Sequence, residues 1–193
     1  TGENQMASEK ETVHTEAKDR WGAFLKLGIL ITCRSIIFSG ISTFLILYLI
    51  EMFAVGKPAG SAVLSVYYGI AALSSLVGGK LADEQGYKKT LIIASIILVA
   101  GNFAFLFGHH LMIAVILVGI MGIGSSLGYS SMVTLGQLYL PNHIGLASGV
   151  TLGLSVSIGG ILAPVLGMVG DLYGLRSVFY ILAALSVVPL ILS

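Results

Sequence analysis

Charged residues are scarce in this chain of 193 residues, at 10% of the total against 56% for hydrophobic residues. Soluble domains are about a quarter charged, so a sequence with a mean hydropathy of +0.97 cannot keep its surface in water. The net charge is +1 and no basic run is interleaved with aromatic residues, which argues against nucleic acid as a partner. The composition therefore predicts an integral membrane protein, with the lipid bilayer as its surroundings.

Cysteine is nearly absent as well. The single cysteine, Cys33, lies in an apolar stretch, which excludes an internal disulfide and a cysteine-based zinc site. His109 and His110 are adjacent in a short turn, a spacing that is poor for chelation from one helix face, and we expect both to be solvated. We therefore expect neither a metal nor a cofactor.

Six apolar runs approach or exceed the roughly 20 residues that a helix needs to cross a bilayer. They cover residues 24–50, 61–81, 90–107, 111–138, 146–169 and 177–192. Residues 1–23 are polar and lack the apolar core of a signal peptide, so we interpret them as a cytoplasmic linker or tail. The prediction is an all-α membrane protein with a six-helix domain at 24–193. Since the sequence starts at Thr1, we expect it to begin inside a longer protein.

Lysine and arginine are concentrated at one end of the predicted spans. The tail and the connection at 82–89 carry most of them, whereas Lys57 and Arg176 fall on the opposite side. Basic residues in short flanks stay on the cytoplasmic side during insertion. The pattern predicts a multi-pass protein of the inner or plasma membrane with both termini in the cytoplasm.

A polar string occurs twice at one constant offset, after the second span of each half of the chain. Its members are Gly79, Asp83, Gly86 and Lys88 in the first copy and Gly167, Asp171, Gly174 and Arg176 in the second. Gly40 and Gly128 keep the same offset. Because each unit has three spans, the second unit enters the membrane upside down. Inverted repeats of this kind form the two access states of many secondary transporters, so we predict two inverted three-helix repeats.

The first copy, continued by Lys89, resembles the signature loop of the major facilitator superfamily. In that family a glycine, a spaced aspartate, a second glycine and paired basic residues link two helices, although Glu84 and Tyr87 stand here where a basic residue is usual. The resemblance implies half of a major facilitator fold and a gating role for the loop. The residues to which it assigns this role are Gly79, Asp83, Gly86, Lys88 and Lys89. The alternative is an ordinary charged turn that only sets topology.

Further segments resemble the C-terminal half of fosmidomycin-resistance-type efflux proteins within that superfamily. They are Arg34-Ser35 and residues 40–45, 135–137, 139–142 and 145–149. The resemblance implies antiport, the efflux of small drugs or metabolites in exchange for protons, a role in antibiotic resistance and an N-terminal six-helix half as partner. No Asp or Glu lies in the middle of any span, so we expect the proton-coupling acid in that other half.

Arg34 is the charged residue that lies deepest in a predicted span. At about 1.5 Å per residue it lies about 15 Å into the first span. An arginine there costs about 3 kcal/mol on insertion scales unless it faces a partner or a wet cavity. Its planar guanidinium can hold a carboxylate or phosphonate through two bonds, which indicates a substrate site for an anion. The alternative is an arginine that binds backbone carbonyls or a neighbouring helix and serves assembly.

Polar side chains recur at helical spacing along the fourth span. The members of this stripe are Ser126, Ser130, Thr134 and Gln137. Because such a stripe could line a cavity, Ser130, Thr134 and Gln137 join Arg34 as predicted substrate-binding residues. The alternative is that the hydroxyls bond carbonyls of their own helix.

Small residues form a seam on the fifth span. Its members are Gly149, Gly153, Ser157 and Gly160. Seams of this composition predict close packing against another helix. In the third span, we expect Asn102 to bond a neighbouring helix.

The leading prediction is the C-terminal half of a twelve-helix, proton-coupled exporter of a small molecule, for which Arg34 favours an anion. One alternative is a half-size carrier that works as a homodimer. Another is a structural membrane protein, which would leave the inverted repeat unexplained. A membrane enzyme would need a nucleophile with a base, or a metal cluster, and no buried His, Asp or Glu supplies one. No catalytic residue is predicted, and substrate identity and transport direction stay open.

Overall fold

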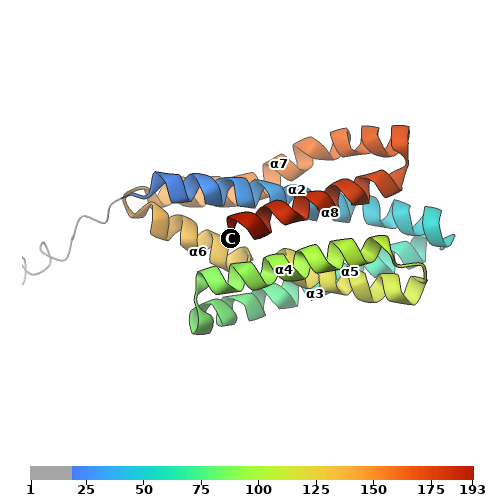
Figure 1. Cartoon of the computed structure of the whole chain (residues 1–193), viewed down its shortest axis with the longest axis horizontal. Helices are drawn as coiled ribbons and strands as arrows, with labels where there is room; N and C mark the ends of the chain where they lie inside the picture. Colours follow the sequence, from blue (N-terminus) through green and yellow to red (C-terminus); the bar gives the residue numbers. More distant parts are fainter. Residues whose placement is uncertain (1–18) are drawn as a thin grey trace, which may run out of the picture.

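A computed structural model describes residues 19–193, without the side chains of Leu154 and Ser155, and these residues form an all-α bundle with six membrane-crossing spans (Figure 1). Residues 1–18 of the predicted tail lie outside the described residues. The fold class predicted from hydropathy is confirmed. The helices are α2 (Trp21–Phe53), α3 (Lys57–Gln85), α4 (Tyr87–Leu106), α5 (Leu111–Ser126), α6 (Tyr129–Tyr139), α7 (Ile144–Tyr173) and α8 (Leu175–Leu192), with a 3₁₀ turn η1 (Pro141–His143) before α7.

The repeated polar string ends the second helix of each unit in the same way. Gly86 separates α3 from α4 with a φ of 94°, and Gly174 separates α7 from α8 with a φ of 85°. An L side chain rarely adopts this backbone conformation, so glycine is required at both positions. The Gly86 N–H donates to Ala82 and the Gly174 N–H donates to Gly170, each at 2.9 Å. The internal repeat is therefore present in the backbone as well as in the sequence.

The fourth span is present as predicted, over Leu111–Tyr139, and it consists of two consecutive helices, α5 and α6. Leu127 and Gly128 lie between α5 and α6, and the backbone departs from helical dihedral angles at Gly128, where φ is −87° and ψ is 0°. At this level α3 approaches so closely that a Cβ added to Gly78 would lie 2.0 Å from the Leu127 carbonyl oxygen. Glycines in the sequence suggested close packing but not an interruption.

The two three-helix units interlock. The first helix of unit one, α2, packs mainly against α7 and α8, and the first helix of unit two, α5, packs against α3 and α4. The third helices, α4 and α8, contact each other (Figure 1). Gly40 of α2 faces Leu182 of α8, and Gly128 faces Leu91 of α4. The two glycines correspond in the repeat, and each allows the third helix of the other unit to approach closely.

An aromatic cluster joins α2, α4 and α8 in the main apolar core. The ring centroid of Tyr48 lies 4.5 Å from that of Phe179 and 5.1 Å from that of Phe105, and the two phenylalanines are 5.2 Å apart. Each such pair contributes about 1 kcal/mol beyond its area burial. The cluster holds the third helices of both units against α2.

The small-residue seam on α7 packs against no helix among the described residues, so its predicted close packing stays a prediction. A Cβ added to Gly149, Gly153 or Gly160 would meet nothing within 4 Å. The close approach is made by Gly159 instead, where an added Cβ would lie 2.8 Å from the Ser35 carbonyl oxygen of α2. The seam therefore lies on the outer face of α7.

Asn102 is also placed differently from the prediction. Its Nδ2 donates to the Leu98 carbonyl of the same helix at 2.8 Å, because the carbonyl one turn back is within reach of a short amide side chain. Its Oδ1 has no partner among the described residues. The bond to a neighbouring helix is thus not formed.

Candidate functional site

Arg34 lies inside the bundle on α2, with 4% of its surface exposed. Its Nη2 donates to the carbonyl oxygen of Gly124 at 2.5 Å and to that of Ser125 at 3.1 Å. Both acceptors belong to the last turn of α5. The guanidinium therefore joins the first helix of unit one to the first helix of unit two.

The interruption at Leu127 explains why these two carbonyls take a side-chain donor. In a continuous helix the carbonyls of Gly124 and Ser125 would accept from the N–H groups four residues later, but α5 ends at Ser126. The C-terminal end of a helix carries partial negative charge, which favours a cation. Arg34 thus caps α5, which is the bonding expected of an assembly role.

The remaining donors of Arg34 are free. Nε and Nη1 are buried and have no hydrogen-bond partner among the described residues. Together they carry three N–H groups, and leaving donors unpaired inside a protein costs about 1–3 kcal/mol. Of the five N–H groups of the guanidinium, the two on Nη2 bind α5 and the other three are available to an acceptor.

A cavity of about 370 Å³ adjoins Arg34 between α2, α3, α5, α6 and α7. Its volume falls within the range of small-molecule sites. Besides Arg34 it is lined by apolar residues and by a set of hydroxyl side chains. These are Ser35, Tyr68, Ser75, Ser125, Ser126 and Tyr129.

One wall of the cavity is aromatic. Phe38 of α2 lies with its ring centroid 5.9 Å from that of Tyr68, in an edge-to-face arrangement. Tyr67 is fully buried behind them, and its hydroxyl donates to Ser125 Oγ at 3.2 Å. Tyr67 therefore supports the residue whose backbone carbonyl binds Arg34. The arrangement offers an apolar surface beside a cation, which suits an organic anion.

The predicted polar stripe is divided by the interruption between α5 and α6. Ser126 lines the cavity with Arg34, whereas Ser130, Thr134 and Gln137 are not among its lining residues. Ser130 faces α3, 3.7 Å from where a Cβ of Gly79 would lie, and its hydroxyl is buried without a partner among the described residues.

The lower part of the stripe connects α6 to α7. Gln137 Nε2 donates to Ser148 Oγ at 3.0 Å. Thr134 is half-buried on the same helix. The structure therefore does not bring Ser130, Thr134 and Gln137 together with Arg34. All three lie on α6, beyond the Arg34 cavity.

The first loop copy lies at the end of α3 and the start of α4. Asp83 is exposed and has no hydrogen bond or ion pair to any residue within 19–193. The nearby ion pair is Lys80 with Glu84, at 3.9 Å on the exposed surface. Lys88 and Lys89 are exposed in the first turn of α4. Among residues 19–193, Asp83 thus presents an unpaired carboxylate at one end of the bundle.

The second loop copy lies at the opposite end of the bundle, as an inverted unit requires. Asp171 and Arg176 are exposed on either side of Gly174. Gly167 lies against α2, where an added Cβ would be 3.7 Å from the Phe44 ring. The string therefore caps both ends of the bundle with the same backbone geometry.

Six membrane-crossing helices in two interlocked units, around a cavity that holds a buried cation, define a membrane transport protein. The chain belongs to the Major Facilitator Superfamily, which it matches over residues 27–193. It is accordingly a transporter component and not an enzyme.

The relatives agree with the resemblance drawn from the sequence. The chain is 29% identical to the fosmidomycin resistance protein of Escherichia coli (strain K12) over 157 residues, which cover 81% of this chain and 38% of that protein. It is 28% identical to the uncharacterized MFS-type transporter YfnC of Bacillus subtilis (strain 168) over 151 residues, which cover 78% of this chain and 37% of that protein. The chain therefore spans less than half the length of these relatives.

A solved structure confirms the fold. The crystal structure of the MFS transporter FucP in the outward conformation superposes with a TM-score of 0.79 at 19% identity. The match covers 90% of this chain and 42% of that one. Half of a major facilitator fold, as predicted, is the architecture of this chain.

Sequence reasoning missed several features of the cavity. The backbone carbonyls of Gly124 and Ser125 carry no side-chain signal, and Ser75 of α3 reads as an ordinary small residue of a span. The cluster of glycines in 119–128 was the available hint, because small residues at such density admit other helices closely.

Proposed function

We propose that this chain is the C-terminal half of a proton-coupled exporter of small drugs or metabolites. The support is the fosmidomycin resistance protein among its relatives, together with a length that covers 38% of that protein. A transporter of this family binds its substrate between two six-helix halves. The described residues would supply one wall of the transport pathway.

The surface of α7 supports a partner half. The seam residues Gly149, Gly153, Ser157 and Gly160 are exposed here, and small residues are enriched where transmembrane helices meet rather than where they face lipid. Asp83, unpaired within 19–193, would find its partner at a helix end of that half. A second copy of this chain is the other possible occupant of the α7 face. Native mass spectrometry of the full-length protein distinguishes one long polypeptide from a dimer of half-size chains.

Arg34 carries the proposal for substrate binding, in which we assign it an organic anion such as a phosphonate or carboxylate. The single supporting observation is that Nε and Nη1 are buried, unpartnered and next to a cavity of about 370 Å³. A carboxylate or phosphonate could accept from both nitrogens at once. Ser130, Thr134 and Gln137 would extend the polar path along α6 toward the membrane surface.

Proton coupling is assigned to the other half. The acidic residues that follow Asp19 are Glu51, Asp83, Glu84 and Asp171, and each lies near a helix end. Proton relays of transporters generally use carboxylates inside the bundle.

The experiment compares Arg34→Lys, Arg34→Ala and the exposed charge-loss control Lys57→Gln in the full-length protein. Lysine keeps a charge but cannot serve the α5 carbonyls and an anion together, so we expect affinity for an organophosphonate such as fosmidomycin to fall at least about tenfold, or about 1.4 kcal/mol. Arg34→Ala should abolish transport, and Lys57→Gln should change neither property.

Two measurements on the same purified variants separate binding from assembly. Ligand titration gives the affinity and thermal unfolding in detergent gives the stability. Unchanged affinity in Arg34→Lys, together with a lowered melting temperature, would show that the arginine only caps α5, and the substrate site would have to be sought along α6.

A further inference from the structure

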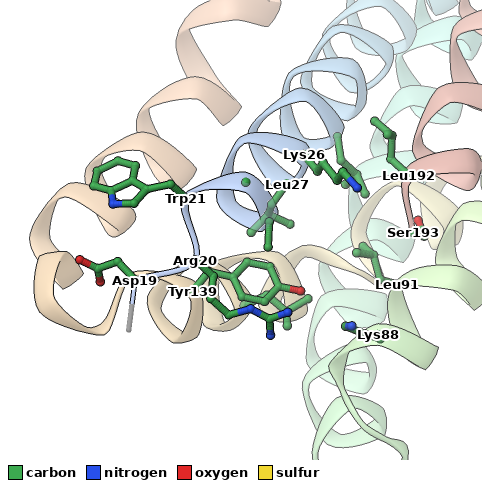
Figure 2. Close-up of a pocket in the computed structure, with 14 residues that line it drawn as sticks. Asp19, Arg20, Trp21, Lys26, Leu27, Lys88, Leu91, Tyr139, Leu192 and Ser193 are labelled. Carbon is green, nitrogen blue, oxygen red and sulfur yellow. The ribbon is translucent and has the colours of Figure 1, made fainter. Parts of the chain in front are cut away.

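A second and larger cavity, of about 620 Å³, opens at one end of the bundle (Figure 2). It lies where α2 begins, α4 begins, α6 ends and α8 ends, so both three-helix units contribute to it. All four of these helix ends lie toward the same end of the bundle. This cavity shares no lining residue with the Arg34 cavity, although Leu30 lines the first and the adjacent Ile31 lines the second.

The rim of this cavity is cationic. Arg20, Lys26 and Lys88 line it, and among the described residues neither lysine has an acidic partner. Asp19 is the one acidic side chain of the lining, and it is engaged by His143 Nδ1 at 3.0 Å and by the Asn142 N–H at 3.3 Å. The lining therefore holds three basic side chains and a single acidic side chain, which is already bound to His143 and Asn142.

Aromatic side chains lie at the rim, and their presence is typical of the level of the lipid headgroups. The Arg20 guanidinium carbon lies 5.8 Å from the centre of the Tyr139 ring, and Figure 2 shows the arginine extended along that ring. Trp21, which is 47% exposed, lies next to it at the start of α2. Tryptophan and tyrosine concentrate where the membrane meets water.

The interior of the same cavity is apolar. Leucines of α2, α4, α6 and α8 form its floor, among them Leu27, Leu91 and Leu192 (Figure 2). A soluble phosphate would use the basic rim alone. A molecule that combines a phosphate with a hydrocarbon chain would use both surfaces.

We propose that this cavity binds the headgroup of an anionic glycerophospholipid. Arg20, Lys26 and Lys88 contact the phosphate, and the leucine floor takes the start of an acyl chain. Basic pockets between transmembrane helices recognise anionic headgroups through the same two contributions. The bound lipid joins α2 and α4 of unit one to α6 and α8 of unit two, and so stabilises the arrangement of units described here. This assignment is independent of the proposed substrate.

The test uses the full-length protein in neutral detergent and measures the melting temperature as lipid is added. Phosphatidylglycerol should raise the melting temperature, and phosphatidylcholine should not. In Lys26→Gln/Lys88→Gln the apparent affinity for phosphatidylglycerol should fall roughly tenfold or more, since each basic residue near a surface contributes to anionic binding. The matched control is Lys57→Gln/Lys80→Gln, which removes two exposed lysines outside the cavity and should respond like the unaltered protein.

Each other outcome overturns the assignment. An equal response of the two double variants would mean that the lipid acts through general surface charge. Glycerol phosphate that reproduces the full effect without a chain would assign the cavity to a soluble phosphate. If Lys26→Gln/Lys88→Gln lowers the melting temperature before lipid is added, Lys26→Glu alone repeats the comparison, and retained lipid affinity in that variant would also contradict the proposal. Transport by these variants is not the readout, so failure here leaves the substrate assignment intact.

Discussion

The first helices of the two units differ although they occupy corresponding places in the fold. In unit one, α2 runs unbroken for 33 residues and carries Arg34 inside the bundle. In unit two, the corresponding span is divided into α5 and α6, and the repeat places Gly122 where unit one has Arg34. An added Cβ at Gly122 would lie 3.0 Å from the Tyr67 carbonyl oxygen, so that position is occupied by helix packing.

In the second helices, the smaller side chain is in unit one and the larger one is in unit two. Gly78 of α3 admits the Leu127 carbonyl at the interruption, whereas the corresponding residue of α7 is Leu166, which lies near Gly40 of α2. One unit thus supplies a buried cation and the other supplies free carbonyls to receive it. The two repeats share one topology but differ in their interiors, and the Arg34 cavity lies at the place where they differ.

The largest effect is expected from a substitution of Gly78, where the two units differ in side-chain size. Gly78→Ala places a methyl group against a backbone carbonyl that has no room to move, so we expect a loss of about 3 kcal/mol, the upper end for overpacking. Thermal unfolding and the yield of monodisperse protein measure it. Gly69→Ala, in the same helix with nothing within 4 Å, is the control and should be neutral or slightly stabilising. Equal behaviour of the two variants would mean that α3 does not approach the interruption this closely.

An intermediate effect is expected from the two loop aspartates. Asp83→Asn should lower transport about tenfold with little change in protein level, because it would weaken the charge-assisted bond that we propose to the partner half. Asp171→Asn should have a smaller effect, since the second copy lacks the paired basic residues that follow Gly86. Transport assays normalised to the amount of membrane protein decide between them. A loss confined to protein level would reduce the loop to a topological element.

The smallest effect is expected from two cysteine substitutions that test the inverted orientation of the two units. Gln85 and Tyr173 are exposed, correspond in the repeat, and end α3 and α7. In a Cys33→Ser background, Gln85→Cys should react with an impermeant thiol reagent from the cytoplasmic side and Tyr173→Cys from the opposite side. Neither change should alter transport by more than about twofold, as surface substitutions usually stay within 0.5 kcal/mol. Labelling of Gln85→Cys from outside only would reverse the proposed orientation.

The regular features of the fold could be predicted from the sequence. Hydropathy located all six spans to within a few residues at most boundaries, because each span must satisfy the bilayer by itself. Gly86 and Gly174 marked the ends of α3 and α7, since only glycine suits their backbone conformation. Arg34 was identifiable because a charge at that depth is rare.

The interior of the site was decided by tertiary structure alone. The partners of Arg34, the interruption at Leu127 and the outward placement of the α7 seam depend on contacts between residues far apart in the chain, such as Gly78 with Leu127. In lipid, apolar residues do not distinguish a helix face toward the bilayer from one toward another helix, so periodicity carries little information about packing. Local pattern therefore determined which segments cross the membrane, and shape complementarity between helices determined which of their groups remain free to bind.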